Sequence, residues 1–150
     1  MEKQKKDWEQ FFEDGQGFHR TVRGGLKRQN IFTPELIQNI AAMGIEKYFM
    51  AIFTHRGILP QNHTMSDFVG ESKLFMTLPE DLEKSLLYFD SLQSICSIFD
   101  FTIIKPKPED VPLFVDAIDR VARLAEQEIA LPATTFHTQE PTVQNAGTLH

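Results

Sequence analysis

The amino-acid sequence predicts an all-α fold, an up-and-down bundle of four to five antiparallel helices. Five segments repeat apolar residues at steps of three and four, which is the period of a helix that buries one face. No segment shows the alternation of a strand ladder, and capping or turn residues separate the five segments. We expect one helical domain over residues 1–130 and a flexible C-terminal tail over residues 131–150, where periodicity is absent.

The first predicted helix spans residues 5–28. Its apolar stripe is formed by Trp8, Phe11, Phe12, Gly15, Phe18, Val22 and Leu26. Four glycines interrupt it, at Gly15, Gly17, Gly24 and Gly25. Because each glycine inside a helix costs up to about 1 kcal/mol relative to alanine, we expect this helix to be kinked or split.

The second predicted helix is the most apolar segment of the chain. Thr33 is a typical N-cap, Pro34 suits the first helical position, and Glu35 complements the helix dipole in the first turn. Apolar residues cover more than half of its circumference, so we expect it to be the central helix of the core. Gly57 then provides a C-cap position, and Pro60 prevents continuation.

Three more helices are predicted, over residues 64–76, 77–101 and 109–130. The first two open on "TMSD" and "TLPE", which have the spacing of capping boxes. The segment "TIIKPKPED", with two prolines, links the second of these helices to the last. The positions expected to be buried are Leu82, Leu86, Phe89, Leu92, Ile95, Cys96 and Phe99, and then Val111, Phe114, Ile118, Val121, Ala125 and Ile129.

Composition and charge exclude several classes of protein. Hydrophobic residues make up 41% of the 150 residues, which is enough to build a core. The net charge of −6 argues against a general DNA-coating protein, because the phosphate backbone attracts positive surfaces. A single cysteine, Cys96, allows neither an internal disulfide nor a zinc cluster. No segment has the apolar length of a signal peptide or a membrane span, so we expect a cytoplasmic protein.

Sequence signatures of common catalytic sites are missing. There is no glycine-rich phosphate loop, no dinucleotide-binding fingerprint, no nucleophile elbow and no His-Glu-x-x-His motif. None of the five histidines has a carboxylate at metal-ligand spacing. We therefore expect neither a metal site nor a bound cofactor.

Two groups of charged residues are candidate ligand contacts. Glu46 and Lys47 lie inside the most apolar helix, where a carboxylate near the core needs a partner or a raised pKa. They are either ligand contacts or part of a structural ion pair or solvated face. Arg20, Arg23 and Lys27 recur at helical spacing, so they share a face. That face either attracts phosphate groups or is only the solvated back of the helix.

The turn "HRGILPQNHT" provides a third candidate. Six residues separate Arg56 from His63, and they include Gly and Pro. A turn that brought the two together would place a permanent cation beside a group that titrates near neutrality. Metal-independent RNA cleavage uses such a pair, because the histidine moves the 2′-hydroxyl proton while the arginine stabilises charge on the phosphate. The structural alternative is that Arg56 complements the helix C-terminus and that Asn62 or His63 caps the next helix.

The segment "AAMGIEKYFMAIFTHRGILPQNHTMSDFV" resembles the signature hairpin of HEPN domains, which are small helical bundles. The shared features are an Ala-rich helix with Glu-Lys, a Gly-containing turn with Pro, and a histidine at the start of the next helix. The residues in these places are Ala41, Ala42, Glu46, Lys47, Ala51, Gly57, Pro60 and His63. The order of five helices agrees with the family over residues 5–130.

The resemblance implies a homodimer, binding of nucleotide or RNA, and a nucleotidyltransferase partner protein in a toxin–antitoxin or defence system. For a subset of the family it also implies metal-independent ribonuclease activity through an Arg/His motif, whose spacing Arg56 and His63 match. The chain departs from the family pattern at Met50, where many members have a lysine, and at "FDFTIIKPKPED", where many have Arg-Tyr-Pro. These departures favour a binding role over catalysis.

The leading hypothesis is a HEPN-like protein that binds a nucleotide, RNA or a protein partner and is not a strong catalyst. Its pocket is expected to be lined by Glu46, Lys47 and His63. The expected phosphate contacts are Arg20, Arg23 and Lys27. One alternative is an endoribonuclease with His63 as general acid/base and Arg56 as the group that stabilises the transition state. The other is a structural dimer or adaptor without a ligand, which would expose aromatic residues such as Phe11, Phe12, Phe32 or Phe53.

Overall fold

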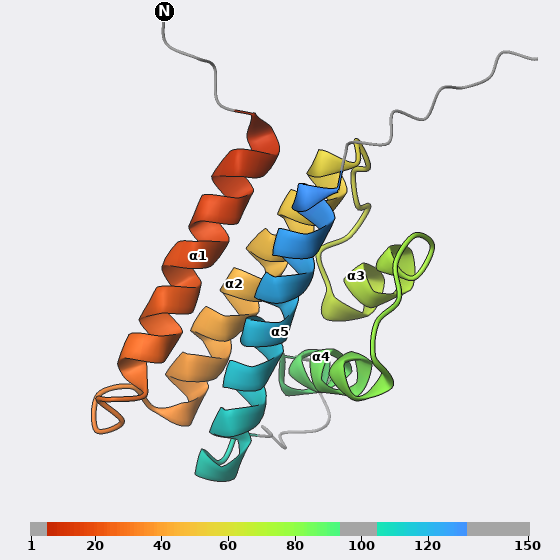
Figure 1. Ribbon diagram of the computed structural model, residues 1–150. Coiled ribbons are helices and arrows are strands. Elements are labelled where there is room, and N and C mark those ends of the chain that lie inside the picture. Colours follow the sequence, from red (N-terminus) through yellow and green to blue (C-terminus); the bar gives the residue numbers. More distant parts are fainter. Residues whose placement is uncertain (1–5, 94–104, 132–150) are drawn as a thin grey trace, which may run out of the picture.

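The computed structural model describes residues 6–93 and 105–131, and every regular element within these ranges is helical. The elements are α1 (Asp7–Gly25), α2 (Pro34–His55), α3 (Met65–Ser72), α4 (Glu80–Gln93), the short 3₁₀ helix η1 (Pro108–Asp110) and α5 (Val111–Ala130). The three long helices α1, α2 and α5 lie side by side, and α3 and α4 cover one side of them (Figure 1). The predicted all-α bundle is confirmed. α2 is antiparallel to α1, and α5 runs in the direction of α2 because α3 and α4 lie across the bundle (Figure 1).

α1 is one continuous helix, so the expected split does not occur. Its glycines instead allow close approach of other helices. A Cβ added at Gly15 would lie 2.9 Å from the ring of Tyr48, and one added at Gly44 of α2 would lie 2.6 Å from Ile118 Cδ1. Tight packing of α1 and α5 on α2 therefore offsets the low helix propensity of glycine.

Both predicted ends of α2 are confirmed. The Thr33 hydroxyl accepts a hydrogen bond of 3.2 Å from the Leu36 amide at the first turn. At the other end Gly57 adopts a φ of +74°, which is accessible to glycine without strain. The next amide, that of Ile58, donates 2.9 Å to the Phe53 carbonyl, which completes a Schellman motif. The chain leaves α2 through a tight reversal.

Several predicted boundaries differ in the structure. α1 ends at Gly25 rather than at residue 28, so Lys27 lies in the turn after this helix. α3 ends at Ser72, whose buried hydroxyl donates to the Val69 carbonyl at 3.0 Å, and residues 73–76 form turns. α4 begins at Glu80 rather than at the predicted residue 77. Pro79 disfavours helical dihedrals at the residue before it, which delays the start. The predicted continuation of this helix beyond residue 93, with Ile95, Cys96 and Phe99, and the tail after residue 131 lie outside the described residues.

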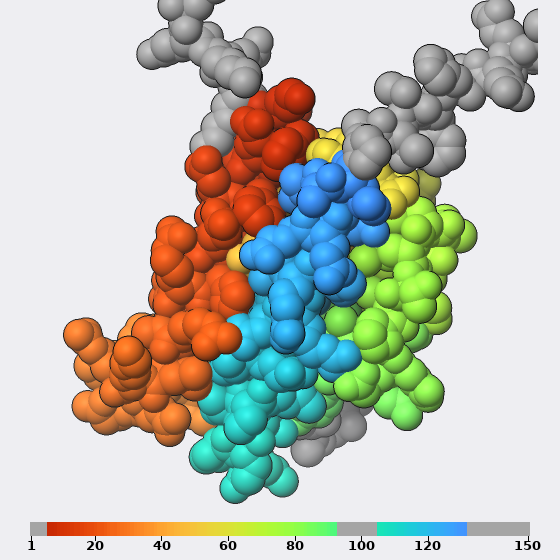
Figure 2. All heavy atoms as spheres, viewed as in Figure 1, coloured from red at the N-terminus to blue at the C-terminus, as the bar shows by residue number. Residues whose placement is uncertain are grey.

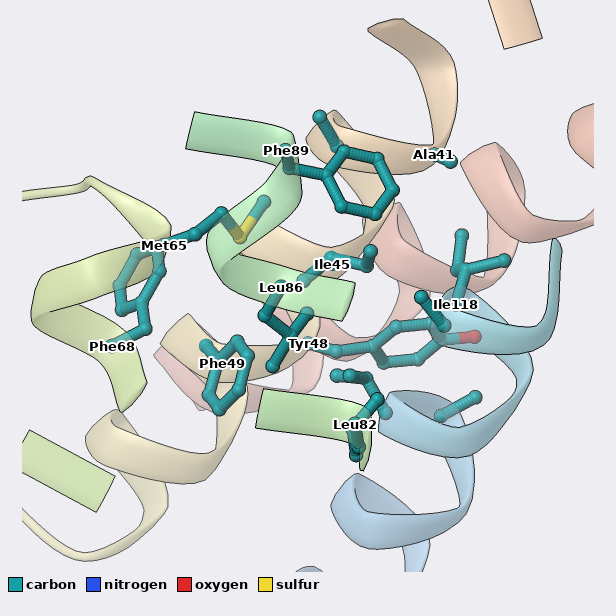
Figure 3. Packing of buried hydrophobic residues seen from close by; sticks show 14 of the residues in the cluster. Ala41, Ile45, Tyr48, Phe49, Met65, Phe68, Leu82, Leu86, Phe89 and Ile118 are labelled. Atoms are coloured by element: carbon teal, nitrogen blue, oxygen red, sulfur yellow. The ribbon is translucent and has the colours of Figure 1, made fainter. Parts of the chain in front are cut away.

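The core forms around α2, as the sequence predicts. Figure 3 shows Ile45, Tyr48 and Phe49 of α2 packed among side chains of α3, α4 and α5. The fully buried large residues are Tyr48, Phe49, Phe53, Phe68, Phe89, Phe114, Ile37, Ile45, Ile52, Leu82, Leu86 and Ile118. Phe53 is among them, and Phe11, Phe12 and Phe32 pack against the core, so these four do not form an exposed aromatic surface. Within the described ranges, no helix has the length and apolar character needed to cross a membrane.

Candidate functional site

Glu46 of α2 meets His63, which precedes the N-cap of α3, at the wall of a pocket. Nδ1 of His63 lies 3.0 Å from Oε1 of Glu46. The reversal at Gly57 brings His63 alongside α2, although 17 positions separate it from Glu46 in the sequence. The pocket has a volume of about 250 Å³ and is lined by Asn39, Ala42, Met43, Glu46, His63 and Met65. Since 52% of the His63 side chain is exposed, the imidazole faces solvent as well as Glu46.

The lining of this pocket is chemically mixed. The Asn39 amide offers donors and an acceptor, the Glu46 carboxylate is an acceptor, and Ala42 and Met43 provide apolar surface. A small number of polar groups around an apolar wall is the usual character of a ligand site. A flat group with polar edges, such as a nucleobase, suits this combination.

The N-terminus of α3, which forms part of the pocket wall, is held by a residue that sequence reasoning missed. The carboxylate of Asp90 on α4 accepts hydrogen bonds from the amides of Met65 at 3.0 Å and Ser66 at 2.7 Å. Thr64 adds the predicted N-cap, since its hydroxyl accepts 3.1 Å from the Asp67 amide. Two otherwise unsatisfied amides of the first turn thus find an anionic partner. Met65 is therefore positioned by α4 as well as by its own helix.

Arg56 lies elsewhere and binds Glu128 of α5. Its Nε and Nη2 atoms lie 3.0 and 2.5 Å from Glu128 Oε2, and the guanidinium stacks 4.3 Å from the centroid of the Phe75 ring. Arg56 is the C-cap of α2 and lies ten positions after Glu46, a distance of about 15 Å at the helical rise. Because His63 lies at Glu46, the described chain does not bring Arg56 and His63 together.

Lys47 faces α1 rather than the Glu46–His63 pocket. Its Nζ lies 5.5 Å from the centroid of the Phe11 ring. Successive residues point about 100° apart on a helix, so Glu46 and Lys47 border different parts of the outer side of α2. Lys47 lines a broad, open depression with Glu13, Asp14, Gly17, Phe18 and Thr21.

The predicted basic face on α1 is directed partly toward α5. Nη2 of Arg23 lies 2.6 Å from Oδ2 of Asp119. Arg20 and Lys27 are exposed and form no ion pair with any residue in 6–93 or 105–131. The structure thus divides the predicted contacts among three places. Glu46 and His63 line the pocket beside α2 and α3, Lys47 lies in the depression between α1 and α2, and the basic face lies beside α1 and α5.

His19 is the centre of a hydrogen-bonded network that the sequence did not indicate. Its Nδ1 lies 3.1 Å from the Tyr48 hydroxyl, and its Nε2 lies 2.6 Å from Oδ1 of Asp119. Burial raises the pKa of Tyr48 to about 12, so this hydroxyl keeps its proton at neutral pH. The Asp119 carboxylate also accepts a hydrogen bond from Arg23. This network joins α1, α2 and α5.

Comparison with solved structures identifies the architecture. The crystal structure of an archaeal HEPN homologue aligns with this chain at a TM-score of 0.60 and 15% sequence identity, over 83% of this chain and 99% of that chain. This chain has a HEPN-like fold. No protein-family model matches it, and no curated protein matches it significantly. Within the described part of this HEPN-like bundle, His, Cys, Asp and Glu side chains form no group of three suited to a metal ion.

Proposed function

We propose that this HEPN-like protein binds a nucleotide or single-stranded RNA in the Glu46–His63 pocket and is not a strong catalyst. The observation that supports this most directly is the meeting of Glu46, His63 and Asn39 around a pocket of about 250 Å³. These three side chains match the hydrogen-bonding edge of a base, while Ala42 and Met43 contact its face.

The phosphate groups of the ligand would lie outside this pocket. Lys47 faces α1 and shares its depression with Glu13 and Asp14, so the phosphates of a mononucleotide would remain in solvent at the mouth of the pocket. For a longer RNA the chain would also contact the basic face formed by Arg20, Arg23 and Lys27. Arg20 and Lys27 are exposed and have no carboxylate at ion-pair distance within the described residues. A phosphate that binds these two side chains therefore displaces water and does not break an existing ion pair.

The test of base binding is a titration with adenosine monophosphate, followed by calorimetry. We expect Asn39→Ala and His63→Ala each to weaken binding about fivefold or more, because each removes hydrogen bonds to the base. The matched control is Asn30→Ala, since Asn30 is an exposed asparagine in the turn between α1 and α2. No binding by the native protein, or an equal loss in Asn30→Ala, would contradict the proposal.

The geometry of His63 also supports a second candidate, a metal-independent endoribonuclease. A carboxylate on Nδ1 orients the ring and leaves Nε2 available for proton transfer. However, Arg56 is bound to Glu128, so a second copy of the chain would have to provide the cation. We expect labelled RNA to remain intact in excess EDTA. Cleavage that is lost in both His63→Ala and Arg56→Ala would favour the endoribonuclease.

We also propose that the protein is a homodimer. Leu36 and Met43 lie two turns apart on one face of α2, and their exposed fractions are 38% and 47%. Exposed apolar residues on one helix face suit an interface between copies. Because Met43 also lines the Glu46–His63 pocket, this interface would border that pocket. Light scattering should give twice the mass of one chain, and Leu36→Glu should reduce it to the mass of one chain. The control Leu74→Glu changes a residue with 86% exposure in the turn after α3 and should remain dimeric.

A further inference from the structure

A second pocket lies where α4 packs on α5, a contact that is visible in Figure 2. It has a volume of about 220 Å³, and its lining residues are Pro79, Leu82, Arg120, Arg123, Leu124 and Gln127. The four residues from α5 are spaced three, four and seven positions from the first, so they share one helix face. Two guanidinium groups and an amide thus border three apolar side chains.

Arg120 is already oriented by its neighbours. Its Nη1 and Nη2 atoms lie 2.7 and 3.0 Å from the two carboxylate oxygens of Asp81, and Asp116 is 3.6 Å away. The Arg120 side chain is only 22% exposed, whereas that of Asp81 is 75% exposed. Asp81 therefore binds Arg120 through a bidentate ion pair, which leaves Arg123 as the main cation for the anionic group of a ligand.

Arg123 is the cation of this pocket that is available to a ligand. It is exposed, one helical turn from Arg120, and it forms no ion pair with any residue in the described ranges. Leu82, which is buried, and Leu124, which is half-buried, line the same pocket. A guanidinium that borders a pocket with apolar side chains favours a ligand that carries a carboxylate or phosphate on an apolar body.

We propose that this pocket binds a small amphipathic anion, distinct from the ligand of the Glu46–His63 pocket. The apolar body of the ligand lies on Pro79, Leu82 and Leu124, and its carboxylate or phosphate binds Arg123. Asp81 and Asp116 at the rim repel polyanions, so RNA and nucleoside triphosphates do not fit.

Thermal denaturation and calorimetry of the full chain test this with four probes at equal ionic strength. Benzoate carries the carboxylate, phenyl phosphate the phosphate, benzamide is the uncharged analogue of benzoate, and inorganic phosphate lacks the apolar body. We expect benzoate or phenyl phosphate to raise the melting temperature, and whichever binds more tightly identifies the anionic group. Benzamide and inorganic phosphate should bind at least about tenfold more weakly, because each lacks one of the two features.

Two variants locate the binding. Arg123→Gln should weaken binding of benzoate or phenyl phosphate about tenfold, because a charge-assisted hydrogen bond is lost at an exposed position. Arg28→Gln removes an exposed arginine from the turn after α1 and should leave binding unchanged. Equal binding of benzamide and benzoate, no response to any probe, or equal effects of the two variants would overturn the proposal. Asn39→Ala should not alter the response, so this test is independent of the nucleotide pocket.

Discussion

At the scale of single residues, Tyr48 makes the stability of the protein depend on alkaline pH. Its pKa is about 12 in the folded chain against 10.0 as the reference, mainly because the phenol is buried. The unfolded chain therefore loses this proton first, so stability is unaffected below pH 10 and falls as pH rises from 10 toward 12. Between about pH 9 and about pH 11 the free energy of unfolding should fall by roughly 1–2 kcal/mol from this group.

Urea unfolding of the native chain and of Tyr48→Phe at the two pH values measures this effect. The variant cannot ionise at this position, so it should lose less stability over the same interval. Tyr88, whose pKa burial also raises, is present in both proteins and cancels in the comparison. An equal loss in both proteins would assign the alkaline sensitivity to other groups.

The Arg56–Glu128 pair provides the second prediction at this scale. The two side chains are 18% and 13% exposed, so Glu128→Gln leaves a largely buried guanidinium without its anion. We expect a loss of about 1–3 kcal/mol in the free energy of unfolding. Glu80→Gln breaks a surface pair with Lys84, in which Glu80 is 85% exposed, and should change stability by less than about 0.5 kcal/mol. If both variants were equally stable, Arg56 would be free for another role.

At the scale of the element, substitutions at the glycines of α1 distinguish the effect of helix propensity from the effect of helix packing. Gly15→Ala would place a Cβ 2.9 Å from the Tyr48 ring, and we expect it to destabilise the protein by about 1–3 kcal/mol. At Gly17 the nearest atom is the Arg20 Nη2, 4.0 Å away, so Gly17→Ala should stabilise it by up to about 1 kcal/mol. Chemical denaturation of both variants would show opposite signs. The same sign in both would mean that close packing of α1 on α2 does not determine the choice of glycine.

At the scale of the whole molecule, the proposed base-binding pocket and the proposed basic face lie on different sides of the pair formed by α1 and α2. Arg20→Gln combined with Lys27→Gln should therefore weaken binding of a single-stranded RNA of about ten nucleotides without affecting adenosine monophosphate. The loss should come with a smaller salt dependence, because fewer counterions are released.

The charge-matched control for this experiment is Lys84→Gln combined with Arg123→Gln, which removes two cations from other faces. Because both double variants change the net charge equally, a general electrostatic effect would weaken RNA binding in both. RNA binding that is insensitive to Arg20 and Lys27 would remove the basic face from the proposed function.

The sequence by itself determined the helices and several of their ends, because those depend on neighbours within one or two turns. Thr33 and Thr64 cap the helices that they precede, and Gly57 ends α2 through its positive φ. The apolar stripe of α2 predicted its central place in the core. The boundary errors at α3 and α4 arose where Ser72 and Pro79 act locally against a periodic pattern that continues past them.

Only the tertiary structure decided which charged residues meet. Glu46 is paired with His63 because the chain reverses at Gly57, whereas Arg56 turns toward Glu128, 72 positions away. His19 and Asp119 are 100 positions apart, and no local pattern links them. Pairing between distant carboxylates and cations depends on how the helices pack, and one-dimensional periodicity specifies only which face of each helix is apolar. The sequence therefore predicted Glu46, Lys47 and His63 for one pocket. The packing of the helices brings Glu46 and His63 together at a pocket, whereas Lys47 faces α1.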